Sequence, residues 1–133
     1  ENGKVVLEGV IAMARACLEN DIPVGLGTDT GCPYVTHYDM WRELCYFVKY
    51  CGVTPAFALH SATLLNARLA GIDSVTGSVE AGKAADLIVC DRDPLADLSA
   101  LRRLHMVIKD GVRIEHPTVK KLPEVERELD KFL

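Results

Sequence analysis

The chain has 133 residues, of which 49% are hydrophobic and 26% charged, and its net charge is −4 at pH 7. This composition is typical of a globular protein with a real core and argues against disorder. The Lys and Arg residues are scattered, which argues against a nucleic-acid partner, and a complete (β/α)8 barrel, at roughly 250 residues, would not fit.

The first part of the chain follows an α/β pattern. Apolar residues recur with helical spacing over residues 4–20, which predicts an amphipathic helix. The apolar run 24–27, bounded by proline and glycine, predicts a strand buried on both faces, and 28–38 predicts a loop. Asp39 is then the expected N-cap of a half-buried helix that ends at Gly52 with a left-handed cap.

The next elements are marked by turn residues. Thr54 and Pro55 form an N-cap and a first helical position, and predict a helix to about residue 65, with a resumption over 67–70 that stops at Gly71. Beyond Gly71 the glycines come closer together, and a compact apolar run predicts a strand over 87–90. Two further runs joined by Asp110-Gly111 predict a hairpin.

The end of the chain is predicted to be helical again. A short helix is expected around 95–101, and helical spacing recurs over 123–133. We expect the carboxylates of this last segment to form a solvated face, not an acid/base pair. The chain therefore divides into residues 1–71, 72–117 and 118–133.

Cysteine usage and hydropathy indicate the setting of the protein. The five cysteines form an odd set without a C-x-x-C pair, so we expect no disulfide framework, no structural zinc knuckle and a reducing, cytoplasmic location. No run is long enough to cross a bilayer, so no membrane partner is expected. Because Glu1 leads directly into a helical pattern, we expect a piece of a longer protein.

Asp29 directly follows the predicted strand, where α/β proteins place their ligands. Thr28 and Thr30 flank it with hydroxyls that are expected to hold its carboxylate. Gly27 and Gly31 would let a ligand or backbone approach closely. An Asx turn that only shapes the loop explains the same residue equally well.

His37 lies further along the same loop, facing either a substrate group or solvent, and a lone loop histidine is more often a surface residue. Cys32 offers an alternative, because with His37 it would form a Cys-His nucleophile pair. No third residue that would orient such a pair is visible, and Pro33 stiffens the loop. The other histidines, His60, His105 and His116, have no metal-ligand spacing with one another.

Five stretches in order resemble one family. They are "ENDIPVGLGTDTG", "HYDMWREL", "GVTPAFALHSATLLNARLAGI", "GSVEAGKAADLIVCDRDPL" and "MVIKDGVRI". Together they resemble the C-terminal part of a metal-dependent amidohydrolase of the imidazolonepropionase-like and Xaa-Pro dipeptidase-like branch. The ordered series is far more specific than any one of its members.

The resemblance implies an α/β fold that is the C-terminal portion of a TIM barrel. Residues 1–71 would form the last barrel helix, the eighth strand and the following helices. Residues 72–117 would form late strands of a small composite β-sandwich domain, with Gly77, Gly82 and Asp86 in structural turn positions, and 118–133 a C-terminal helix.

The resemblance also implies a site. Asp29 would end the eighth strand, contact the metal centre and exchange a proton with the attacking water, and His37 would border the substrate pocket. The metal would be divalent, zinc with one or two ions, and the substrate a small amide, cyclic amide or dipeptide. Because the family's other metal ligands are not found in this chain, we expect the isolated chain to be inactive.

A non-enzymatic role is the alternative. The strand predicted over 24–27 would have unpaired edges in this chain, and proteins seldom leave such edges open. The open faces would be covered either by a missing N-terminal barrel portion or by a second copy in a homo-oligomer. In the second case the chain would be a self-associating or partner-binding module.

Overall fold

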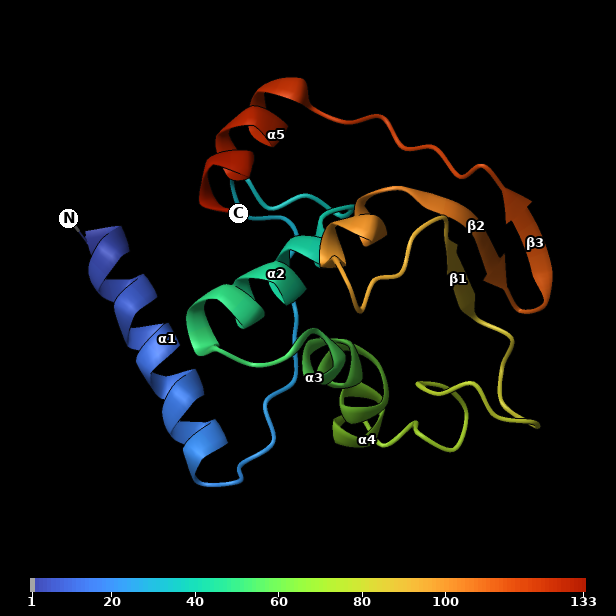
Figure 1. Cartoon of the computed structure of the whole chain (residues 1–133), viewed down its shortest axis with the longest axis horizontal. Coiled ribbons are helices and arrows are strands. Elements are labelled where there is room, and N and C mark those ends of the chain that lie inside the picture. The colour runs from blue at the N-terminus through green and yellow to red at the C-terminus, as the bar shows by residue number, and fades with distance from the viewer. Residues whose placement is uncertain (1) are drawn as a thin grey trace.

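Helices form the first half of the chain and a small antiparallel sheet the second (Figure 1). The computed structural model describes residues 2–133. The elements are α1 (Asn2–Glu19), α2 (Met40–Cys51), α3 (Pro55–His60), η1 (Ser61–Leu65), α4 (Asn66–Leu69), β1 (Leu87–Cys90), η2 (Leu98–Arg102), β2 (Leu104–Lys109), β3 (Val112–Glu115), α5 (Pro123–Leu129) and η3 (Asp130–Phe132).

The first predicted helix is confirmed, but its apolar side lies open. Val6 and Met13 in α1 are 64% and 63% exposed. Figure 1 shows α1 at one end of the molecule, away from the sheet, with α2 as its neighbour. Arg15 Nε donates to Tyr50 O at 2.8 Å and joins the two helices. Within residues 2–133, the amphipathic face of α1 therefore lacks the partner that its pattern requires.

The predicted strand over 24–27 does not form, and the expectation that it is buried on both faces is wrong for this chain. The backbone is extended but pairs with no other strand of the described residues. Val24 and Leu26 are half-buried, whereas Gly25 and Gly27 are exposed. A parallel strand needs neighbours on both sides to form its ladder, and no such neighbour lies within residues 2–133.

Helix α2 begins and ends near the predicted residues, with one difference. Gly52 has φ 74° and its N–H donates to Val48 O, which confirms the left-handed C-cap. Asp39 occupies the N-cap position, but its carboxylate makes no capping bond. It accepts instead from Thr36 Oγ1 at 2.6 Å and Trp41 Nε1 at 3.2 Å.

Elements α3, η1 and α4 form one helical stretch. Thr54 Oγ1 accepts the N–H of Phe57 at 3.2 Å, which confirms the N-cap with proline at the next position. The stretch contains a π-helical turn at Ser61–Leu65 and ends before Gly71, whose φ is 71°. Such π turns are rare and occur often at functional sites.

The sheet has the order β1-β2-β3 and is antiparallel throughout. Asp110 and Gly111 have φ values of 50° and 80°, as a two-residue turn of type I′ requires, so the predicted hairpin is confirmed. Asp86 accepts from the backbone N–H of Asp110 at 2.8 Å and from Lys109 Nζ at 2.9 Å. These contacts lower the pKa of Asp86 and confirm its structural role.

The core lies between the helices and the start of the sheet. Its buried members are Leu44, Phe47, Ala58 and Leu98, the last from η2, a 3-10 turn where a short helix was expected. Gly77 has φ 94°, and a Cβ there would lie 2.6 Å from Ala67 Cβ. The helical stretch therefore packs directly against this glycine turn.

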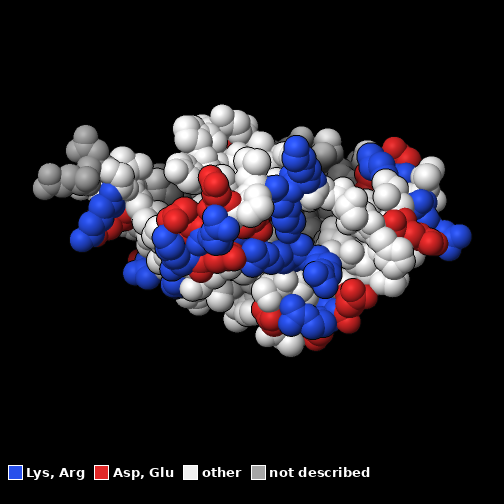
Figure 2. Space-filling model, turned by 90° about the horizontal axis from the view of Figure 1, so that it is seen from above, with Lys and Arg blue, Asp and Glu red and all other residues white. Residues whose placement is uncertain are grey.

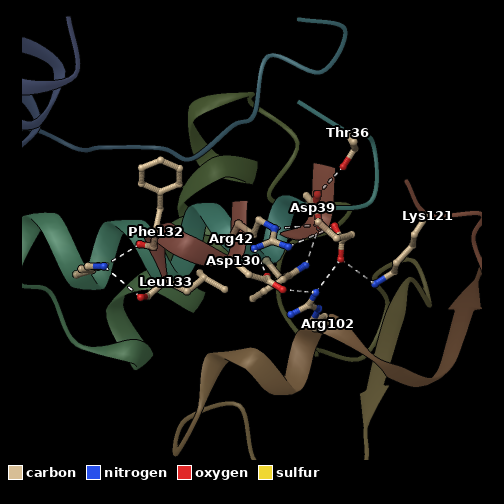
Figure 3. A network of polar contacts seen from close by, with 11 residues as sticks. Thr36, Asp39, Arg42, Arg102, Lys121, Asp130, Phe132 and Leu133 are labelled. Atoms are coloured by element: carbon tan, nitrogen blue, oxygen red, sulfur yellow. Dashed lines mark hydrogen bonds and ion pairs between the residues drawn. The ribbon is translucent and has the colours of Figure 1, made fainter. Parts of the chain in front are cut away.

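The C-terminal helical segment is held by a buried ion network (Figure 3). Arg42 of α2, only 2% exposed, lies 3.3 Å from Asp39, 3.3 Å from Glu126 and 2.7 Å from Asp130. Arg102 lies 2.9 Å from Glu126 and 3.0 Å from Asp130. The expected solvated face of 123–133 is thus wrong for Glu126, because two arginines from elsewhere in the fold face it.

Surface charge is mixed on the face where α5 lies. Figure 2 shows acidic and basic side chains side by side over the middle of this face. None of the helices formed within residues 2–133 combines the length and hydropathy of a transmembrane span.

Candidate active site

Asp29 stands at the junction between the extended segment and its loop. It has φ 51°, a left-handed conformation that is uncommon for residues with a side chain, and it is exposed. The hydroxyls of Thr28 and Thr30 do not hold its carboxylate as expected, because they bond to each other at 2.7 Å. The thiol of Cys32 donates to Asp29 Oδ2, with Sγ 3.6 Å away, and this is the side-chain hydrogen bond that the carboxylate accepts among the described residues.

The contact with Asp29 opposes activation of Cys32. The negative charge of Asp29, together with the hydrogen bond to it, raises the pKa of the thiol. A nucleophilic cysteine needs the opposite, a lowered pKa. The structure therefore gives no support to the Cys32-His37 nucleophile pair.

His37 is exposed on the same loop. Its ring packs edge-on against Tyr38, with centroids 5.2 Å apart, and the Tyr38 hydroxyl accepts the N–H of Leu122 at 2.9 Å. No hydrogen bond between His37 and Asp29 occurs within residues 2–133. The two predicted site residues thus share a loop but are not joined by a hydrogen bond or ion pair within the described residues.

The chain does not assemble a metal centre on its own. No group of three or more His, Cys, Asp and Glu side chains among the described residues could hold an ion. His105 lies near His116, with ring centroids 5.5 Å apart, and His105 Nδ1 lies 2.9 Å from Asp91 Oδ1, but this cluster is not such a group. Since protein zinc sites need three or four ligands, Asp29 alone does not fit a metal ion.

An apolar groove of about 750 Å³ borders the extended segment. Its walls come from the open side of α1, from residues 23–27 and from α2, where Tyr46 and Tyr50 face it. Exposed apolar surface of this kind is found at ligand-binding grooves and at protein interfaces. The groove runs along the segment that leads to Asp29.

The glycines near Asp29 do not act as expected. Nothing lies within 4 Å of a Cβ built on Gly27 or Gly31, so neither is needed for close approach within this chain. The close contact occurs at Gly25, where a Cβ would lie 2.5 Å from Asn66 Oδ1. Asn66, which sequence reasoning missed, bonds to the backbone of Leu26 from 40 residues away, and no local pattern indicates such a contact.

These features define an α/β segment in which an exposed acid follows an extended run beside open, apolar helix faces. The amidohydrolase family model matches residues 3–114, and the chain belongs to that family. The family and its structural neighbours imply a TIM-barrel fold, of which this chain is a small α/β part with a three-stranded sheet.

Individual relatives agree with this assignment. Imidazolonepropionase of Picrophilus torridus is 32% identical over 106 residues, which cover 76% of this chain and 26% of the relative. A crystal structure of a "putative prolidase" from Bifidobacterium longum is 44% identical, with a TM-score of 0.94 over 98% of this chain and 32% of the other. The crystal structure of a Xaa-Pro dipeptidase with bound methionine is 36% identical, with a TM-score of 0.73. The match covers 80% of this chain and 25% of that one.

The resemblance to the imidazolonepropionase-like and Xaa-Pro dipeptidase-like branch is therefore confirmed. The chain spans about a quarter of the length of the curated relatives it matches first.

Proposed function

We propose that the complete protein containing this chain is a metal-dependent hydrolase that cleaves a C–N bond in a small amide, cyclic amide or dipeptide. The observation that carries the proposal is the position of Asp29, an exposed carboxylate in a left-handed conformation at the end of the extended segment. That segment lies within the part matched to the amidohydrolase family. Relatives named as imidazolonepropionase and Xaa-Pro dipeptidase support the class of bond.

Asp29 is proposed as the acid/base residue and as one metal ligand. An exposed carboxylate can accept a proton from an attacking water and return it to a leaving amine, which such groups do with gains of about 10²- to 10⁴-fold. A divalent ion, with zinc as our choice, would supply an activated water when bound. Its remaining ligands would come from segments outside these 133 residues, since Asp29 alone does not fit an ion.

His37 is proposed as a substrate-site residue. It is exposed on the loop that Asp29 begins, and its ring is oriented by the edge contact with Tyr38. A neutral or charged imidazole at that place can donate a hydrogen bond to a substrate oxygen.

The open surfaces agree with a longer protein. We propose that the apolar groove and the exposed side of α1 pack against the remaining barrel, since a TIM barrel places such helix faces against its strands. In the same proposal residues 1–71 complete the barrel, 72–117 belong to the small β-sandwich and 118–133 form the C-terminal helix.

A second candidate function rests on the same exposed side of α1. The chain would be a non-enzymatic module that pairs with a second copy through this side, where Val6 and Met13 are exposed. Light scattering on the 133-residue chain tests it. A dimer that is lost in a Val6→Lys, Met13→Lys variant supports the module, whereas a monomer at high concentration contradicts it.

The enzyme proposal is tested by hydrolysis assays on the complete protein with zinc added. Release of proline from methionyl-proline and ring opening of imidazolonepropionate sample the dipeptide and the cyclic amide. Asp29→Asn should lower kcat by about 10²- to 10⁴-fold. Asp21→Asn is the matched control, because Asp21 is also exposed with a positive φ of 55°.

The expected pattern is loss in Asp29→Asn, full activity in Asp21→Asn and loss of activity on chelation. Equal activity of both variants, or turnover of neither substrate by the complete protein, would overturn the proposal.

A further inference from the structure

We propose that Asn66 is a positioning residue for Asp29, and this role rests on the function proposed above for Asp29. The carboxamide of Asn66 holds the backbone of Leu26 and so fixes the end of the extended segment from which Asp29 projects. Leu26 and Asp29 are three residues apart, a span of about 10 Å at most. A shift at Leu26 is therefore passed on to the carboxylate.

The contact uses both backbone groups of one residue. Asn66 Oδ1 accepts the N–H of Leu26 at 3.0 Å, and Asn66 Nδ2 donates to the carbonyl of Leu26 at 2.8 Å. A neighbouring β-strand offers a residue the same donor and acceptor pair. Within the described chain, the backbone groups of residues 23–29 make no hydrogen bonds besides these two with Asn66.

Glycine at position 25 makes the contact sterically feasible. A Cβ on Gly25 would lie 2.5 Å from Asn66 Oδ1 and 3.0 Å from Leu69 Cδ1. Real Cβ atoms do not come that close, so a side chain here would displace the carboxamide. Gly27, two residues later, has nothing within 4 Å of its Cβ position.

The helical stretch presents Asn66 from a fixed base. The N–H of Asn66 bonds to Ser61 O, five residues earlier, and so closes the π-helical turn η1. Asn66 Nδ2 also lies 3.4 Å from Ala62 O. Ser61 and Ala67 on either side are buried, with 0% and 4% exposure. The carboxamide is thus held by a packed element, whereas the extended segment has no backbone partner besides it within residues 2–133.

The first test uses amide exchange and needs no activity. In the 133-residue chain, Asn66→Ala and Gly25→Ala should speed exchange of the Leu26 amide by about tenfold, measured by NMR. Matched controls are Gly27→Ala and Arg68→Ala, since the Arg68 side chain is exposed and makes no hydrogen bond or ion pair among the described residues, while its carbonyl bonds only within the local turn. An unchanged exchange rate of the Leu26 amide in Asn66→Ala, or equal changes in all four variants, would overturn the proposal that Asn66 holds Leu26.

The second test is a double-mutant cycle in the complete protein with methionyl-proline as substrate. Asn66→Ala should lower kcat by about 10- to 100-fold with a smaller change in KM, because small displacements of a reacting group have effects of this size. In the Asp29→Asn background the same change should cause no further loss. A residue that only stabilises the fold would lower kcat equally in both backgrounds, and that result would contradict the positioning role.

The two proposals fail in different ways. If Asp29→Asn leaves kcat unchanged, the function proposed for Asp29 is wrong, and the exchange measurement still decides whether Asn66 holds Leu26. If Asp29→Asn abolishes turnover and Asn66→Ala leaves both kcat and exchange unchanged, only the positioning role is wrong.

Discussion

Replacement of Arg42 by methionine should strongly destabilise the fold. The guanidinium is buried and lies within 3.3 Å of carboxylates of Asp39, Glu126 and Asp130. Burial opposes its charge, but contact with Asp130 and the charges of Asp39 and Glu126 outweigh burial and raise the pKa of Arg42. Arg42→Met keeps the length of the stem and removes the charge that these acids share.

The magnitude follows from what remains behind. Asp39 and Glu126 are 5% and 7% exposed, so both stay away from water in Arg42→Met. Removing one partner of a buried ion pair costs about 3–5 kcal/mol, because the other charge is stranded. We expect the lower end, about 3 kcal/mol. None of the Arg42 nitrogens has a well-directed hydrogen bond among the described residues, and Glu126 keeps Arg102.

The matched control is Arg102→Met. Arg102 faces two of the same acids, Glu126 and Asp130, but its side chain is 35% exposed. Exposed ion pairs contribute about 0–1 kcal/mol, so this variant should lose at most about 1 kcal/mol. Adding Glu126→Leu to Arg42→Met should recover part of the loss, because it removes one stranded charge.

The free energy of unfolding of wild type and the three variants is measured by urea unfolding, monitored by circular dichroism and extrapolated to zero urea. We expect the free energy of unfolding to be highest for wild type, followed by Arg102→Met and then by the double variant that carries both Arg42→Met and Glu126→Leu. The single variant Arg42→Met should be the least stable. Equal losses for Arg42→Met and Arg102→Met would show that burial does not decide the strength of this network, and would refute the reasoning.

Three further predictions concern single positions. Gly77→Ala should cost about 1–3 kcal/mol more than Gly82→Ala in urea unfolding, because both have positive φ but only Gly77 has heavy atoms within 4 Å of its Cβ position; equal costs would contradict this. Cys32 should react slowly with iodoacetamide at neutral pH, and Asp29→Asn should speed the reaction, because Asp29 raises the pKa of the thiol; mass spectrometry of the labelled peptide decides. Burial opposes ionisation of Asp130, but Arg102 and Arg42 lower its pKa below its usual 3.8. Its stabilisation is therefore present above about pH 4 and lost as pH falls further, so unfolding midpoints of Asp130→Asn should depend less on pH between about pH 5 and pH 2.

Local chemistry could be predicted from the sequence. The caps at Gly52 and Thr54 and the hairpin at Asp110-Gly111 formed where turn and capping residues placed them. Each of these depends on contacts within about four residues, which the sequence displays directly. Asp29 was likewise placed at the end of an extended run by its neighbours alone.

Long-range pairing could not be predicted in this way. The apolar run 24–27 indicates a segment suited to burial in a sheet, but a ladder depends on neighbouring strands, and none pairs with it within residues 2–133. The charge pattern of 123–133 has the same limit. Nothing local to Glu126 shows that Arg42 and Arg102 face it. The predicted solvated face is therefore wrong for Glu126, whereas Glu124, Glu128 and Asp130 are exposed as expected.

The glycines of "PVGLGTD" show how a local pattern can carry long-range information that is assigned to the wrong residue. Glycine near an acid predicts close approach, and Gly27 and Gly31, each two residues from Asp29, were the expected places. The contact occurs at Gly25 because the approaching group is the side chain of Asn66 on α4, and it meets the backbone at Leu26. The sequence therefore indicates that some residue of this segment must be glycine. Which residue it is depends on where the side chain of Asn66 reaches the segment. If Asn66 positions Asp29, the glycine that matters for the acid is the one that admits Asn66, not the one closest in sequence.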